Sequence, residues 1–391
     1  MVPMSTDAGG SGTPGPPSQY PPQPNPPPGY WPPPPGYGYA PPPGYGPPPS
    51  YGPPPGYGYA PQSWTPPPLK PGIIPLRPLT LSDIFNGAVS YIRANPKATL
   101  GLTTIVVVIT QLLALVLSAG PLAAGGELAP TLTGEQVSTG VLISSSLSSL
   151  AAVVATGLAS ILLSGLLTVV VGRAVFGSGI TIGEAWQRLR SRLWALIGFS
   201  VLEVVAAVLL LAVAVGLIFW VGFAAGGLAA TVIAIPVVVA TLAALLFFGT
   251  MLTFVPAIIV LERLDIISAV TRSFKLVKRD FWRVLGIRLL AMIVAQLIAS
   301  AVAIPFSLGG QIMLLSVETT ALAMLALTLL AVGGAIGQII TAPFSAGVVV
   351  LQYTDSRIRS EAFDLVLQTG AAHGPAAPSD STDHLWLTRP N

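Results

Sequence analysis

One carboxylate, Glu203, lies inside a long apolar stretch and is the residue best placed to do chemistry. It is the only charged residue between Leu193 and Leu261. A carboxylate within a membrane helix is costly unless it is protonated or partnered, and such residues commonly mark proton or substrate pathways. Glutamines at similar depths in three other apolar stretches could join it in one polar layer, namely Gln111, Gln296 and Gln338.

Three interpretations of Glu203 are open. It could form a proton or substrate site in the core of a helix bundle, or a hydrogen bond between helices that sets their packing. A helix that begins later in the sequence would instead place it near the membrane interface. We favour the two structural interpretations, because polar side chains commonly serve helix packing in membranes.

A second candidate is the basic stretch RSFKLVKRDFWRVLGI, at residues 272–287. Apolar side chains recur before and within it at helical spacing, so we expect an amphipathic helix on the membrane surface. Its basic side chains would then contact anionic lipid headgroups. A nucleic-acid site is the weaker interpretation, because lipid phosphates already satisfy charges this close to a membrane span. The predicted lipid contacts are Arg272, Lys275, Lys278, Arg279 and Arg283.

The composition indicates a membrane protein. Of 391 residues, 52% are hydrophobic and 8% are charged, whereas a soluble domain has about 25% charged residues. The mean hydropathy is +0.74 and the net charge is +3. Cysteine is absent, and the two histidines, His373 and His384, lie near the C-terminus, which excludes thiolate or histidine sites in the membrane. We therefore expect no catalytic residue, cofactor or metal site, and a protein that is not an enzyme.

Gaps between charged residues predict six membrane-spanning helices, since each gap exceeds the ~20 apolar residues that cross a bilayer. All 18 basic residues then fall on one side of the membrane, and the loops on the other side carry only acidic charges. The positive-inside rule predicts a multi-pass plasma-membrane protein with both termini in the cytoplasm. The predicted spans are 98–120, 143–171, 194–219, 227–259, 284–305 and 320–350.

Three similar segments, at residues 80–101, 181–198 and 265–286, precede pairs of spans. Each begins with a candidate helix N-cap, Thr80, Thr181 or Asp265, and the first two continue as the T-x-x-D or T-x-x-E capping box. We predict three repeated units, each an amphipathic "elbow" helix followed by two spans, in an all-α membrane protein. Residues 355–368 predict a fourth amphipathic helix, whose apolar face holds Ile358, Ala362, Phe363 and Leu365.

The first 76 residues differ in composition from the rest of the chain. They hold 29 of the 40 prolines and eight of the ten tyrosines, and PPPGYGYAP occurs twice, at 33–41 and 53–61. Proline lacks a backbone donor, so we expect a disordered cytoplasmic tail with short polyproline II runs. Its composition fits a flexible spacer and an interaction arm equally well. The predicted organisation is this tail (1–76), a six-helix membrane domain (77–369) and a flexible C-terminal tail (370–391).

Four motifs resemble a bacterial integral-membrane family known as the glycerophosphoryl diester phosphodiesterase membrane domain, which includes proline- and glycine-rich transmembrane proteins of high-GC Gram-positive bacteria. The resemblance covers roughly residues 77–369. The motifs are RPLTLSDIFNGAVSYIRANP, TIGEAWQRLRSRLW, AIIVLERLDIISAVTRSFKLVKRDFWRVLGI and LQYTDSRIRSEAFDL.

The last motif is the most specific. The family pattern is Y-x-D-x-R-x-R-x-E-G-x-D-L, and this chain departs from it at Ala362, which stands where the family has glycine. The family takes its name from fusions to a separate soluble hydrolase domain, and nothing like that domain is present here. The resemblance thus implies a fold and no activity. The matching residues are Tyr353, Asp355, Arg357, Arg359, Glu361, Asp364 and Leu365.

Two functions fit these observations. The first is a non-enzymatic scaffold or accessory factor for cell-envelope components, in which residues 1–76 recruit a protein partner and the elbow helices contact the lipid bilayer. The alternative is a transporter or lipid-handling protein that uses the polar layer around Glu203. A polar cavity reaching Glu203 would favour the alternative, and a tightly packed core would favour the first.

Overall fold

The computed structural model describes residues 72–134, 138–371 and 383–387, and over these ranges the chain is helical, with no strand. Every described residue belongs to one of the two units into which the chain divides, Thr65–Asn391. Of the predicted tail at 1–76, all but residues 72–76 lie outside the described ranges. The architecture below is therefore that of this unit.

The predicted set of six spans is confirmed, since the described residues hold six helices long and apolar enough to cross a membrane. Two spans are irregular: one begins with a π-helical turn, Lys97–Gly101, and another breaks into two helices after Met251. The short helix α3 (Leu128–Thr133) lies in the first loop. The spans are Lys97–Gly101 with α2 (Leu102–Ala124), α4 (Thr139–Val175), α6 (Leu193–Ala225), α7 (Gly227–Met251) with α8 (Val255–Leu261), α10 (Phe281–Leu315) and α11 (Thr320–Glu361).

The three elbow helices begin at the predicted N-caps: α1 (Leu81–Ala94) at Thr80, α5 (Ile182–Arg190) at Thr181 and α9 (Ile266–Arg279) at Asp265. Both predicted capping boxes form. In the second, Thr181 donates its N–H to Glu184 over 3.1 Å and accepts from the Glu184 N–H over 3.3 Å. The bond from the Thr181 backbone is the main cause that lowers the pKa of Glu184. Local sequence alone therefore sets where each elbow helix starts.

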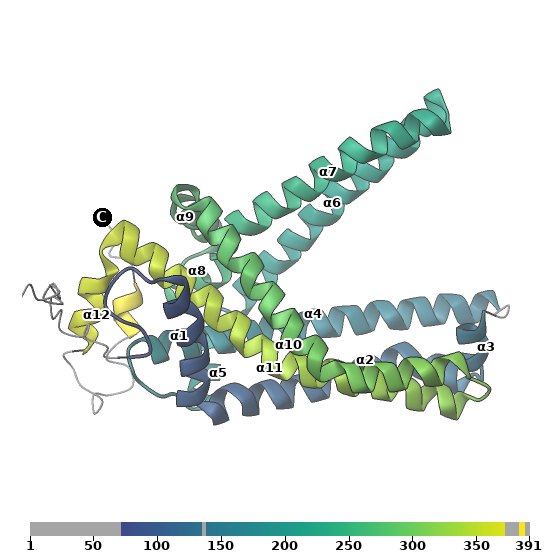
Figure 1. Cartoon of the computed structure of the whole chain (residues 1–391), viewed down its shortest axis with the longest axis horizontal. Coiled ribbons are helices and arrows are strands. Elements are labelled where there is room, and N and C mark those ends of the chain that lie inside the picture. The colour runs from purple at the N-terminus through teal and green to yellow at the C-terminus, as the bar shows by residue number, and fades with distance from the viewer. Residues whose placement is uncertain (1–71, 135–137, 372–382, 388–391) are drawn as a thin grey trace, which may run out of the picture. The chain divides into compact units, whose positions relative to one another are not determined.

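The repeated units are also visible in the packing. Within each unit the two spans lie side by side, as α2 with α4, α6 with α7, and α10 with α11 (Figure 1). The elbow helices lie where the first span of each unit begins, and we call this the elbow side. The elbow helices bury apolar residues against the protein: α1 packs on α11, α5 on α4 and α9 on α8.

The contact between α1 and α11 shows how closely an elbow helix packs. Phe85 stacks on Phe344 with ring centroids 5.5 Å apart, and the Tyr91 hydroxyl donates to the Pro343 carbonyl. Burial raises the pKa of Tyr91. A Cβ on Gly347 would lie 2.6 Å from the Tyr91 ring, so only glycine permits this approach. The apolar face of α1, expected to lie in lipid, is instead buried in protein.

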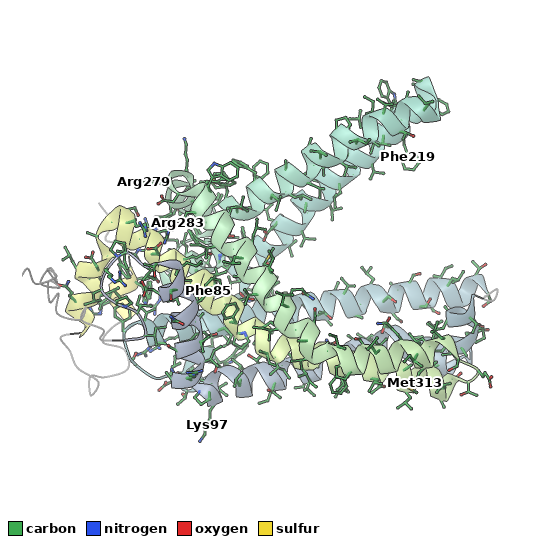
Figure 2. All side chains as sticks on the ribbon, in the orientation of Figure 1. Phe85, Lys97, Phe219, Arg279, Arg283 and Met313 are labelled. Carbon is green, nitrogen blue, oxygen red and sulfur yellow. The ribbon has the colours of Figure 1, made fainter. Side chains whose placement is uncertain are left out.

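The α6/α7 hairpin is different, because few of its residues are buried. They are Leu196 and Phe199 at the start of α6, and Thr241, Thr250 and Met251 in the second half of α7. Beyond Phe199 most side chains of α6 are exposed, and Phe219, labelled in Figure 2, is 74% exposed. Apolar side chains without protein partners on a membrane helix contact the lipid bilayer.

The helix α11 corrects the prediction for the C-terminal region. It runs unbroken for 42 residues, about 63 Å, which exceeds the ~30 Å hydrocarbon core. The predicted separate helix at 355–368 was wrong: residues 355–361 continue α11, and α12 (Phe363–Ala371) follows. Ala362 separates the two helices in the left-handed conformation, with φ 53°. Ile358 and Phe363 of the predicted apolar face are buried, whereas Leu365 is exposed.

The strained backbone at Ala362 yields a prediction. A left-handed residue with a Cβ costs roughly 1–2 kcal/mol, and glycine avoids most of this cost. We expect Ala362→Gly to raise the free energy of unfolding in mixed detergent micelles by about 1 kcal/mol. The control Ala206→Gly, in the interior of α6, should lower it by about as much. If Ala362→Gly also lowered the free energy of unfolding, the inference of backbone strain at Ala362 would be wrong.

Candidate functional site

A polar cavity of about 330 Å³ lies where the three repeated units meet. Its lining comes from α4 of the first unit, α6, α7 and α8 of the second, and α10 and α11 of the third. This volume lies at the lower end of the range for ligand sites, about 300–1,000 Å³. The polar residues that line it are Ser160, Ser164, Thr168, Glu203, Thr253, Arg288, Gln338 and Ser345.

The break between α7 and α8 builds one wall of the cavity. Pro256 has no N–H to donate to the carbonyl four residues earlier, which favours a break in the helix there. The Gly249 carbonyl, just before the break, accepts a hydrogen bond from the Arg288 Nη1 over 3.1 Å and from the Thr253 hydroxyl over 3.0 Å. Interrupted helices are tolerated in membranes where they line a cavity and their backbone groups find partners.

Glu203 and Arg288 bring opposite charges to this cavity. The two side chains attract each other electrostatically, but within the described ranges Glu203 makes no direct hydrogen bond or ion pair. Its side chain is exposed. A carboxylate and a guanidinium that share one cavity without direct contact leave hydrogen-bonding capacity on both groups for a third, polar molecule.

The predicted polar layer is divided between different places. Gln338 lines the cavity with Glu203, whereas Gln296 donates to the Ser300 hydroxyl over 3.3 Å and lines a separate hollow. The amide nitrogen of Gln111 lies 3.8 Å from the position that a Cβ on Gly334 would occupy, so Gln111 packs against α11. Arg288 lines the cavity beside Glu203, whereas Gln111 and Gln296 do not.

The sequence interpretation missed Arg288 as a cavity residue. Its position eight residues into α10 was the available signal, because a charge at that depth faces a polar space or a partner.

The five predicted lipid-contacting residues divide into two groups. Lys275, Lys278 and Arg279 are exposed on α9, in keeping with contact to a membrane surface. Arg272 and Arg283 instead make ion pairs inside the protein. Figure 2 labels Arg279 and Arg283, one from each group.

Arg272 belongs to a buried network around Glu262, whose side chain has no exposure. The Arg272 Nε donates to Glu262 over 2.7 Å, and the Tyr353 hydroxyl donates to the same carboxylate. Glu361 accepts from both Arg272 and Arg357, over 3.0 Å each. Burial disfavours the charge on Arg272, but these two carboxylates outweigh it and raise the pKa of Arg272.

Arg283 belongs to a second network, centred on Asp355. The Asp355 carboxylate accepts from the Leu79 N–H over 2.8 Å, from the Arg283 Nη2 over 2.9 Å and from the Arg359 Nε over 3.0 Å. The two arginines also donate to the Leu79 carbonyl, over 2.6 and 3.1 Å. One carboxylate thereby ties the segment before α1 to α10 and α11.

These two networks contain five of the motif residues named above: Tyr353, Asp355, Arg357, Arg359 and Glu361. In this arrangement they hold helices together. Over the described residues, no group of three histidine, aspartate or glutamate side chains is placed to hold a metal ion. The cavity is therefore the candidate functional site.

Comparison of the chain with protein-family models, with curated protein sequences and with solved structures finds no match.

The Asp355 network predicts a large loss of stability on substitution. Asp355→Ala would leave two arginines and the Leu79 N–H without their acceptor. Because both arginines are 33% exposed, we expect a loss near the lower limit for breaking a buried ion pair, about 3 kcal/mol, in the free energy of unfolding in mixed micelles. The control Lys278→Ala, at an exposed position, should stay within about 0.5 kcal/mol of the parent protein. Equal stability of the two variants would refute this role for Asp355.

Proposed function

We propose that the protein is a lipid-handling membrane protein whose cavity binds the polar head of an amphiphile. The observation that carries this proposal is the cavity itself, in which Glu203 and Arg288 face one space among hydroxyl and amide groups. Of the two functions inferred from the sequence, a cavity that reaches Glu203 favours this one.

The chemistry of the lining indicates the class of ligand. Glu203 can accept from an ammonium or hydroxyl group, and Arg288 can donate to a phosphate or carboxylate. Leu163, Leu167 and Val349 provide apolar walls beside these charges. A head group that combines an anionic part with a cationic or hydroxyl part, such as that of a phospholipid, therefore matches the site. The cavity has room for a head group, and the acyl chains would lie along the apolar spans.

We also propose that the elbow side faces the cytoplasm and that the membrane is the plasma membrane. The support is the distribution of charge, with the basic residues of the described loops on the elbow side and Glu127 and Glu318 on the other.

A cysteine-labelling experiment tests this orientation. The thiol of the Lys275→Cys variant should react with an impermeant thiol reagent in inside-out vesicles and stay unreactive in intact cells. The opposite pattern would reverse the orientation.

Three further inferences stay predictions from the sequence. A partner-recruiting arm depends on residues 1–76, almost all of which lie outside the described ranges. Membership of the family named in the sequence analysis depends on the four motifs. Residues of the last motif form the networks around Glu262 and Asp355, which is compatible with this membership. That the chain has no enzymatic activity is likewise an expectation from its residue types.

Substitution of the cavity charges tests the proposed function. Glu203→Gln keeps the shape but removes the charge, so we expect at least about tenfold weaker binding of phosphatidylethanolamine, since a hydrogen bond to a charged group contributes about 1.5–3 kcal/mol. Arg288→Gln should weaken the binding similarly. The measurement is lipid retained by the purified protein in nanodiscs of phosphatidylethanolamine and phosphatidylglycerol, quantified by mass spectrometry after delipidation and exchange.

The matched control is Gln296→Ala, which removes a polar side chain from an exposed position outside the cavity, and it should bind lipid as the parent protein does. Unchanged lipid binding in both cavity variants would exclude the cavity as the binding site.

A further inference from the structure

The C-terminal segment, residues 383–387, docks on the membrane domain, although the sequence predicted a flexible tail there. It forms a 3₁₀ turn, Asp383–Trp386, and Trp386 is only 3% exposed. The difference has a physical cause: the Trp386 ring finds aromatic partners, with ring centroids 5.1 Å from Phe363, 5.5 Å from Phe176 and 6.1 Å from Tyr353.

Phe176, Tyr353, Arg357 and Phe363 surround Trp386, and we call this site the socket. The socket also binds the backbone of the C-terminal segment. The Arg357 Nη1 donates to the Trp386 carbonyl over 3.1 Å, and the Arg357 guanidinium lies 4.0 Å from the centre of the Phe363 ring. Gly172 lies beside the indole, and a Cβ there would be 2.7 Å from the Leu261 side chain, so glycine permits the close approach of α4 to α8 next to Trp386. Aromatic contacts and a backbone hydrogen bond together make a specific peptide site.

The charges around the socket match the C-terminal sequence. Arg173, Arg188 and Arg263 line a small hollow that Trp386 also lines. In the sequence DSTDHLWL, residues 380–387, two aspartates precede Trp386 by six positions and by three positions. An acidic peptide with a tryptophan anchor therefore suits this basic, aromatic surface.

The helices α4 and α8 line both the cavity and the hollow beside the socket. On α4 the cavity is lined up to Thr168 and the socket hollow begins at Val169. On α8 the cavity includes Ala257 and the hollow includes Val260, one turn later. The hollow that Trp386 lines thus lies on the elbow side of the cavity, about one turn of α8 away.

We propose that this socket is a binding site for the chain's own C-terminal segment, which closes the elbow-side end of the cavity when Trp386 is seated. The peptide site stands on the contacts of Trp386 alone. Only its regulatory meaning, control of access to a lipid-binding cavity, rests on the proposed function.

Cysteine labelling tests the closure directly, because the chain has no cysteine of its own. Thr168→Cys places a thiol on the cavity wall next to the socket. A second variant, Lys275→Cys, carries a thiol at an exposed position on the elbow side. Its labelling in a parallel vesicle preparation shows that the elbow side faces the reagent. In those vesicles we expect Trp386→Ala to raise the labelling rate of the Thr168→Cys thiol by at least about tenfold, because the substitution removes the ring that fills the socket. The control Leu387→Ala, at a more exposed neighbour, should leave the rate unchanged.

A peptide experiment separates closure from misfolding. A chain that ends at residue 379 should label rapidly at Thr168→Cys, and a synthetic peptide of residues 380–391 should restore protection. The same peptide with Trp386→Ala should not restore it. Rapid labelling that the parent peptide cannot suppress, or slow labelling of both the shortened chain and the Trp386→Ala variant, would overturn the proposal. Neither measurement reads out lipid binding, so failure of lipid binding in the Glu203→Gln comparison leaves this test intact.

Discussion

The described part of the protein depends on one carboxylate shared among three chain segments. Asp355 accepts hydrogen bonds from the Leu79 backbone, from Arg283 and from Arg359. Such a group is stable when buried only if each charge has a partner, so the segment before α1, the start of α10 and the end of α11 must meet at one point. The Glu262 network makes the same demand on α8, α9 and α11. Together the two carboxylates join elements from all three units on the elbow side.

This elbow-side core explains why the membrane part can contain a cavity. The contacts that hold the second unit to the other two lie at the elbow-side ends of its helices. The first and third units also pack at their far ends, where Ala119, Leu128 and Ala129 cluster with Val317 and Ala323. The spans of the second unit therefore need not pack against the others along their whole length. The break before Pro256 then turns the Gly249 carbonyl toward Arg288, and the space beside it holds Glu203.

Features set by adjacent residues could be predicted from the sequence. Six spans, three repeated units and the N-caps Thr80, Thr181 and Asp265 follow from local composition and short-range hydrogen bonds, and the structure has them. The ion networks could not be predicted, because Leu79 and Asp355 are 276 positions apart and nothing in the sequence pairs them. For the same reason the basic stretch looked like a single lipid-binding surface, whereas Arg272 and Arg283 face protein carboxylates. Of the expected polar layer, Glu203 and Gln338 share the site, and Arg288 was not expected there.

The length of α11 has a mechanical consequence. Its first residues lie beside the loop that holds Glu318, its middle lines the cavity, and its last turns carry Asp355, Arg357 and Glu361. Pro343 lies near the middle of this helix, and an internal proline is a point at which a helix bends. Membrane thickness acts on the inclination of such a helix. A change of thickness would therefore move the half of α11 that follows Pro343, which carries Tyr353 and Arg357 against Trp386.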